Sequence, residues 1–182
     1  WPYEKFQSEV QSRLTPSQIH DPQKIRLPPY YPDSNLIRRD WARFYDCVTA
    51  MDAEVGAILN QLRADGLDDN TIVFFYSDHG SGMPRHKRVL LDSGMHVPMI
   101  IRTPRPWQTL LQGLPGTSSG QLISFVDLPP TVLQLTAQQK PEWMQGHSFC
   151  AGNEARAFAF GHRDRVDEAI DCARSVRDSR FL

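Results

Sequence analysis

The feature that most constrains this chain is a run of apolar residues spaced at three- and four-residue intervals over more than twenty positions. Such spacing places side chains on one face of an α-helix, and a helix with one apolar face packs against a larger body. The run consists of Trp41, Phe44, Tyr45, Val48, Met51, Val55, Ile58, Leu59 and Leu62. Candidate N-caps precede it at Asp33, Ser34 and Asn35, and Gly66 stands where such a helix would end. The sequence therefore predicts a long amphipathic helix packed on a globular core.

Composition excludes several classes of protein. The 182 residues include 20 Lys and Arg against 21 Asp and Glu, a formal net charge of −1, so nothing indicates a nucleic-acid partner. The longest apolar runs of five or six residues are far shorter than the roughly 20 that span a bilayer. Six of the 14 prolines precede residue 33, which predicts an extended, Pro-rich entry segment over residues 1–36. We expect residues 37–140 to form an α/β domain and residues 141–182 to begin a small C-terminal subdomain.

The strands predicted after the helix indicate an α/β fold. Residues 71–76 are apolar on both alternate faces and rich in β-branched and aromatic side chains, as in a parallel strand covered on both sides. A second strand is predicted at 97–102, and Asp127 with two following prolines predicts a helix start. Short strands at 157–160 and 173–177, separated by a charged loop, predict the start of a small antiparallel sheet.

A polar, glycine-containing loop follows the strand at 71–76. Asp78, His79 and Gly80 stand at the carboxyl end of that strand, which is where α/β sheets bind ligands. A carboxylate and an imidazole in one loop are ligands for a divalent cation. The basic residues 85–88 that follow are donors for a tetrahedral oxyanion. This pattern favours a metal-assisted site for an anionic ester, and the alternative is a solvated loop with a capping Asp.

The order of motifs resembles the sulfatase family of the alkaline phosphatase superfamily. Residues 75–80, Lys87 and residues 92–101 follow the order strand, Asp-Asn-Gly or Asp-His-Gly, Lys, Gly-x-x-Val-Pro, strand. Further similarity covers residues 28–33, 39–46, 52–73, 124–131 and 144–146, and residues 174–181 are most similar to the heparan N-sulfatase branch and arylsulfatase-like members. The resemblance implies part of a sulfatase-like α/β sandwich with a mostly parallel sheet, and a sulfuric ester hydrolase acting on a carbohydrate sulfate ester or sulfamate.

The resemblance also assigns roles to individual residues. Asp78 and His79 would be metal ligands, with Ca²⁺ implied by the family and Mn²⁺ or Zn²⁺ suggested by His79, which stands where many members have Asn. Lys87 falls on the catalytic lysine that contacts the sulfate. His96 stands where many members have Arg and would face the substrate, with a structural role as the alternative. Asp167, with the glutamate after it, would contact sugar hydroxyls or form a solvated turn.

The family's nucleophile motif, C/S-x-P-x-R, is absent, and so are the two Asp ligands that precede it in sulfatases. Formylglycine, made from the Cys or Ser of that motif, is expected in an N-terminal part that precedes this chain. His20 stands too far along the chain for the family's catalytic histidine. The chain is thus expected to be a C-terminal portion that is inactive alone. The resemblance implies a periplasmic or secreted enzyme, and the sequence itself leaves the compartment open. The alternatives are a phosphodiesterase or phosphonate monoester hydrolase, favoured by Asp-His, and an inactive homologue.

Overall fold

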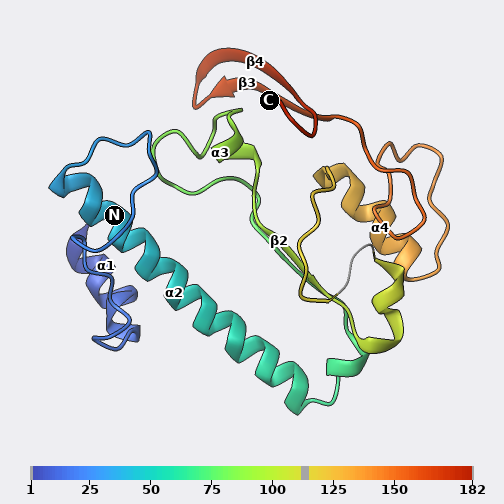
Figure 1. The fold of residues 1–182 in the computed structure, drawn as a ribbon, viewed down its shortest axis with the longest axis horizontal. Coiled ribbons are helices and arrows are strands. Elements are labelled where there is room, and N and C mark those ends of the chain that lie inside the picture. The colour runs from blue at the N-terminus through green and yellow to red at the C-terminus, as the bar shows by residue number, and fades with distance from the viewer. Residues whose placement is uncertain (1, 112–114, 182) are drawn as a thin grey trace. The chain divides into compact units, whose positions relative to one another are not determined.

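The computed structural model describes residues 2–111 and 115–181, which divide into two compact units, Trp1–Asp68 and Asp69–Leu182 (Figure 1). Of the helices in these described ranges, none has the length and apolarity needed to cross a bilayer. The predicted division of the chain into three segments stays a prediction.

The first unit contains the predicted long helix. Helix α2 spans Asn35–Ala64, and the backbone N–H of Ile37 donates to the Ser34 side chain at 3.4 Å, so Ser34 is the N-cap. The helix ends before Gly66, whose φ of +69° is the left-handed conformation that glycine adopts at little cost. The helix and both of its predicted ends are confirmed.

The segment predicted to be extended contains a short helix. Helix α1 spans Tyr3–Glu9, and its Phe6, together with Val10 after it, is buried against Ala50 of α2. Two apolar residues four positions apart are too few to establish a helical period in a sequence, but they suffice once a second helix offers an apolar surface.

The second unit begins with two strands, β1 (Val73–Tyr76) and β2 (Met99–Arg102), which pair antiparallel with Phe75 opposite Ile100. The predicted mostly parallel sheet is not confirmed, because both strand pairs in the described residues are antiparallel. A parallel connection needs a crossover, usually a helix, whereas the only helix between β1 and β2 is the four-residue α3 (Asp92–Met95). Burial on both faces is not seen either, since Tyr76 and Ile100 are exposed.

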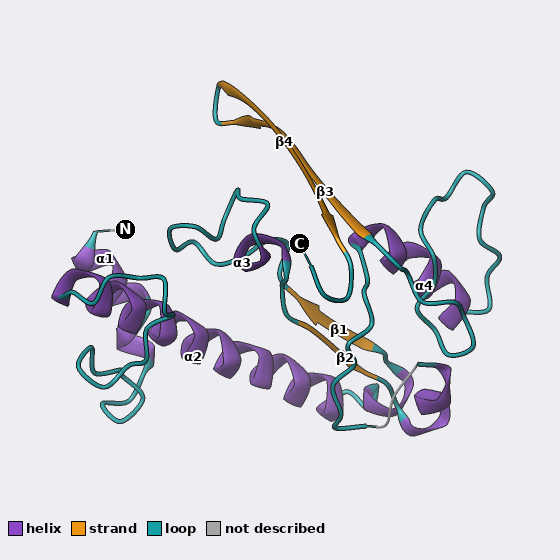
Figure 2. Cartoon of the chain, turned by 45° about the horizontal axis from the view of Figure 1, so that its top comes forward, coloured by secondary structure: helices purple, strands orange, loops and turns teal. Residues whose placement is uncertain are grey.

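The C-terminal strands form a hairpin longer than predicted. Strand β3 (Ala159–Val166) pairs antiparallel with β4 (Ala169–Arg177), which confirms the small antiparallel sheet (Figure 2). The residues predicted as a charged loop lie within these strands, because their charges pair across the hairpin: Arg174 with Asp164 at 2.6 Å and Arg163 with Asp171 at 2.6 Å.

Helix α4 (Leu128–Leu135) starts where Asp127 and the prolines predict, but Asp127 does not cap it with its side chain. The buried carboxylate accepts hydrogen bonds from the backbone N–H groups of Ser124 and His147, both at 2.8 Å, and from the guanidinium of Arg156. Burial raises the pKa of Asp127, but these hydrogen bonds and the Arg156 charge outweigh it and hold the pKa below its usual value. Asp127 therefore joins three segments of the second unit.

Candidate functional site

Asp78 and His79 lie together in the loop that leaves the carboxyl end of β1. The Nε2 atom of His79 lies 3.6 Å from Oδ1 of Asp78, and Asp78 is 82% exposed. The Nδ1 atom of His79 lies 2.7 Å from the carbonyl oxygen of Gly80. Since a carbonyl oxygen only accepts, this contact places a proton on Nδ1, which leaves Nε2 as the ring atom that a cation could bind.

This donor pair suits a divalent cation. Two ligand atoms bound to one cation at about 2.0–2.5 Å lie roughly 3–4 Å apart, which the separation of Nε2 and Oδ1 matches. A metal-binding histidine also typically donates its other ring N–H to a carbonyl or carboxylate, as His79 does to Gly80. Across residues 2–111 and 115–181, no three His, Cys, Asp or Glu side chains converge as a complete cation site would require. The loop therefore offers two candidate ligands and not a whole site.

Two glycines bring this loop against α3. The N–H of Gly80 donates to the carbonyl of Gly94 at 2.9 Å. A Cβ on Gly80 would lie 2.1 Å from the Ser93 carbonyl oxygen, and a Cβ on Gly94 would lie 2.2 Å from that of Val89. Backbone atoms cannot rotate away, so both positions require glycine. The loop bearing Asp78 and His79 is thus fixed to the segment after Lys87.

We expect Gly80→Ala to destabilise the second unit by about 1–3 kcal/mol, because the added methyl group collides with the backbone of Ser93. Gly82→Ala is the matched control in the same loop, since a Cβ at Gly82 meets nothing within 4 Å. Urea denaturation of both variants measures the difference. Equal stability of the two would contradict the close approach of Gly80 to α3.

Lys87 is tied to the same loop through its backbone. Its N–H donates to the carbonyl of Ser81 at 3.0 Å, two residues after His79, and its side chain is exposed. The neighbouring His86 is half-buried, with Nδ1 2.9 Å from Oγ of Ser81, and burial lowers its pKa. This shift favours the neutral imidazole, so His86 adds less positive charge to residues 85–88 than the sequence predicts.

The remaining candidates pair with groups other than Asp78 and His79. His96 lies beyond α3 with Nδ1 3.5 Å from Asp92, which also pairs with Arg177 of β4. Asp167 forms the turn of the hairpin and bonds Arg88 at 2.5 Å. In the first unit, His20 lies 2.9 Å from the buried carboxylate of Asp46.

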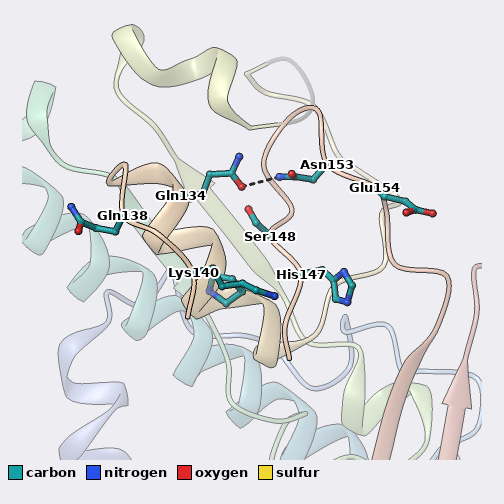
Figure 3. Close-up of a pocket in the computed structure, with 8 residues that line it drawn as sticks. Gln134, Gln138, Lys140, His147, Ser148, Asn153 and Glu154 are labelled. Carbon is teal, nitrogen blue, oxygen red and sulfur yellow. Dashed lines mark hydrogen bonds between the residues drawn. The ribbon is translucent and has the colours of Figure 1, made fainter. Parts of the chain in front are cut away.

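A polar pocket of about 370 Å³ lies elsewhere in the second unit, between α4 and the loop that follows it (Figure 3). Gln134 and Asn153 face each other across it, joined by a hydrogen bond of 2.9 Å. None of Asp78, His79, Lys87 and His96 lines this pocket.

The sequence did not identify three residues that shape the loop. Ser81 bonds both Lys87 and His86, Ser93 donates to the carbonyl of Arg85 at 2.5 Å, and Arg163 of β3 donates to the carbonyl of Arg88. Ser93 lies inside the motif around Gly94, which was a signal for its role. Nothing in the sequence around Arg163 distinguishes it from the other arginines of the hairpin.

Comparison with known proteins places these residues in context. The sulfatase family model matches residues 2–138. A ulvan-active sulfatase from Formosa agariphila is 43% identical over 169 residues, which is 92% of this chain and 27% of the relative. Human N-sulphoglucosamine sulphohydrolase is 32% identical over 119 residues, 64% of this chain and 22% of that enzyme.

Solved structures agree with the sequence comparisons. The crystal structure of yidJ from Bacteroides fragilis superimposes with a TM-score of 0.65 at 27% identity, over 84% of this chain and 35% of that one. The chain spans about a quarter of the length of the curated relatives named above. With the family model matched over most of its length, the chain belongs to the sulfatase family.

Proposed function

We propose that the protein containing this chain hydrolyses the sulfate esters of a carbohydrate. The observation that carries the proposal is the pair of His79 Nε2 and Asp78 Oδ1, 3.6 Å apart, at the carboxyl end of β1 in a chain of the sulfatase family. A metal-assisted site suits an anionic substrate whose charge must be neutralised for attack. Hydrolysis of a sulfate ester agrees both with the family and with this pair of candidate metal ligands.

In this proposal Asp78 and His79 hold a divalent cation, which is Ca²⁺ by family or Mn²⁺ or Zn²⁺ because His79 offers nitrogen. The bound cation would supply positive charge to the sulfuryl oxygens. Because two ligands make an incomplete site, the other ligands and the formylglycine nucleophile come from parts of the protein outside this chain. For the same reason the 182-residue chain alone does not turn over sulfate esters.

Lys87 neutralises charge on the transferring sulfuryl group, and His96 faces the rest of the substrate. Support for Lys87 comes from its hydrogen bond to Ser81, which keeps it in the loop of the metal ligands. Strands outside this chain would extend β1 and β2 into the mostly parallel sheet that the family's sandwich implies. In that sandwich, residues 37–140 belong to the α/β domain and residues 141–182 begin the C-terminal subdomain.

The substrate we propose is a sulfated polysaccharide such as ulvan. The support is the 43% identity to a ulvan-active sulfatase, which extends over 92% of this chain and so includes residues beyond the shared site motifs. An N-sulfated sugar is the second candidate, supported by the weaker similarity to N-sulphoglucosamine sulphohydrolase.

A second reaction, hydrolysis of a phosphodiester or phosphonate monoester, is favoured by His79 in place of the Asn of many sulfatases. The test is to measure kcat/KM of the full-length protein for ulvan oligosaccharides, 4-nitrophenyl sulfate and bis(4-nitrophenyl) phosphate. We expect release of sulfate from the first two substrates. Release of 4-nitrophenol from the phosphodiester should be slower. A preference for the phosphodiester would replace the sulfatase proposal with the second reaction, and absence of all three activities would indicate an inactive homologue.

A further inference from the structure

The residues on either side of the pair His86–Lys87 have a strained backbone. Arg85 has a φ of 66° and Arg88 a φ of 68°, in the left-handed region that residues with a Cβ rarely occupy. Such conformations persist only where the surrounding structure enforces them, and they concentrate at functional sites. The backbone that presents Lys87 is therefore held by contacts from outside residues 85–88.

Both strained residues receive a hydrogen bond on their carbonyl oxygen from a side chain elsewhere in the second unit. Ser93 donates to the carbonyl of Arg85, and Nη1 of Arg163 donates to the carbonyl of Arg88. The Ser93 contact spans eight residues, but the Arg163 contact spans 75 and joins the hairpin to the loop. The side chain of Arg88 is held as well, by Asp167 at 2.5 Å.

The β3–β4 hairpin orients the Arg163 side chain toward the carbonyl oxygen of Arg88. The β3–β4 register shifts between Arg163 and Arg165, and a β-bulge of this kind redirects the side chains beside it. The Nη2 atom of Arg163 donates to Asp171 at 2.6 Å, which fixes the guanidinium from β4. Its Nε is buried and has no partner in the described structure.

We propose that Arg163 is a positioning residue for Lys87, acting through its hydrogen bond to the Arg88 carbonyl. That bond holds the left-handed backbone of Arg88 and so fixes the direction in which the Lys87 side chain leaves the loop. This inference rests on the proposed function only for the action of Lys87 on the substrate. The placement of Lys87 itself is tested without any activity.

The first test is amide hydrogen exchange in the 182-residue chain. Arg163→Ala is expected to speed exchange of the Lys87 N–H about tenfold or more, because its bond to Ser81 depends on the strained turn. Arg163→Lys, which keeps a charged donor group but lacks the guanidinium fork, should give a smaller increase. Arg165→Ala is the matched control, since Arg165 lies on the same strand, is 64% exposed and pairs with Glu168 at 3.8 Å. Unchanged exchange at Lys87 in folded Arg163→Lys and Arg163→Ala would overturn the proposal.

The second test is a double-mutant cycle in the full-length enzyme with an aryl sulfate. Arg163→Ala is expected to lower kcat about 10- to 100-fold with little change in KM. The reason is that a displaced Lys87 ammonium loses its contact with the transition state. In a Lys87→Ala background the same change should have almost no further effect, whereas a purely structural role would lower kcat by the same factor in both backgrounds. Equal losses overturn the proposal. An inactive wild-type enzyme would refute the proposed function and leave the hydrogen-exchange result to decide the role of Arg163.

Discussion

Replacing Lys87 by alanine is expected to lower kcat of the full-length sulfatase about 100- to 1000-fold, or roughly 3–4 kcal/mol in transition-state stabilisation. An ammonium held beside the sulfuryl group stabilises charge that moves onto the ester oxygens as sulfur transfers, so its loss affects the transition state more than the bound substrate. Because the side chain of Lys87 is exposed, its removal should leave the stability of the fold within about 0.5 kcal/mol. Initial rates with 4-nitrophenyl sulfate and thermal unfolding measure the two effects separately.

Lys24→Ala is the matched control for this variant. Lys24 is 84% exposed and its nearest acidic partner, Asp21, lies 3.8 Å away, so the substitution removes the same side chain from the other unit. Its kcat should stay at the wild-type value. Near-normal kcat in Lys87→Ala together with loss of activity in Arg88→Ala would show that the catalytic cation is Arg88 and that the alignment of the motif is wrong.

The largest loss of stability is expected from Asp127→Ala, at about 3–5 kcal/mol in the free energy of unfolding. The substitution leaves the guanidinium of Arg156, which is 16% exposed, without its carboxylate, and removes the acceptor of the Ser124 and His147 N–H groups. Asp33→Ala is the control, because Asp33 also binds an arginine, Arg38, through both oxygens but is 65% exposed. Urea denaturation should show a much smaller loss for Asp33→Ala.

Asp127 also makes stability depend on pH. Its pKa in the folded protein lies below the value of about 3.9 expected in the unfolded chain. Its contribution is therefore fully present above about pH 4–5 and is lost as the pH falls through the lower, folded pKa. Asp127→Asn should flatten this acid-induced loss when denaturation is repeated between neutral pH and pH 3. An unchanged acid profile in Asp127→Asn would assign the loss to other carboxylates.

Local patterns in the sequence predicted the elements whose signals are themselves local. Helix α2 was predictable with both ends, because apolar spacing, the Ser34 cap and Gly66 all act within one helix. The start of α4 was predictable from its prolines. The pairing of β1 with β2 was not, because a strand that is apolar on both faces indicates burial but not the direction of its neighbour.

The candidate site was predictable to a similar degree. The Asp-His-Gly motif after a strand located Asp78 and His79, and the structure brings their side chains together. The role of Lys87 came from the resemblance, and its assignment as a catalytic residue stays a prediction. The contact of Arg163 with the Arg88 carbonyl could not be predicted, because it joins residues 75 positions apart through a β-bulge.

The account is tested most directly by the metal dependence of sulfate release by the full-length enzyme. After chelation, adding back Ca²⁺, Mn²⁺ or Zn²⁺ should restore hydrolysis of a sulfate ester in the wild type and in Asp52→Ala and His162→Ala, which alter exposed side chains of α2 and β3. Asp78→Ala and His79→Ala should each stay at least about 100-fold below the wild type at the same metal concentration. Full restoration of activity in both Asp78→Ala and His79→Ala would contradict the assignment of this pair as metal ligands.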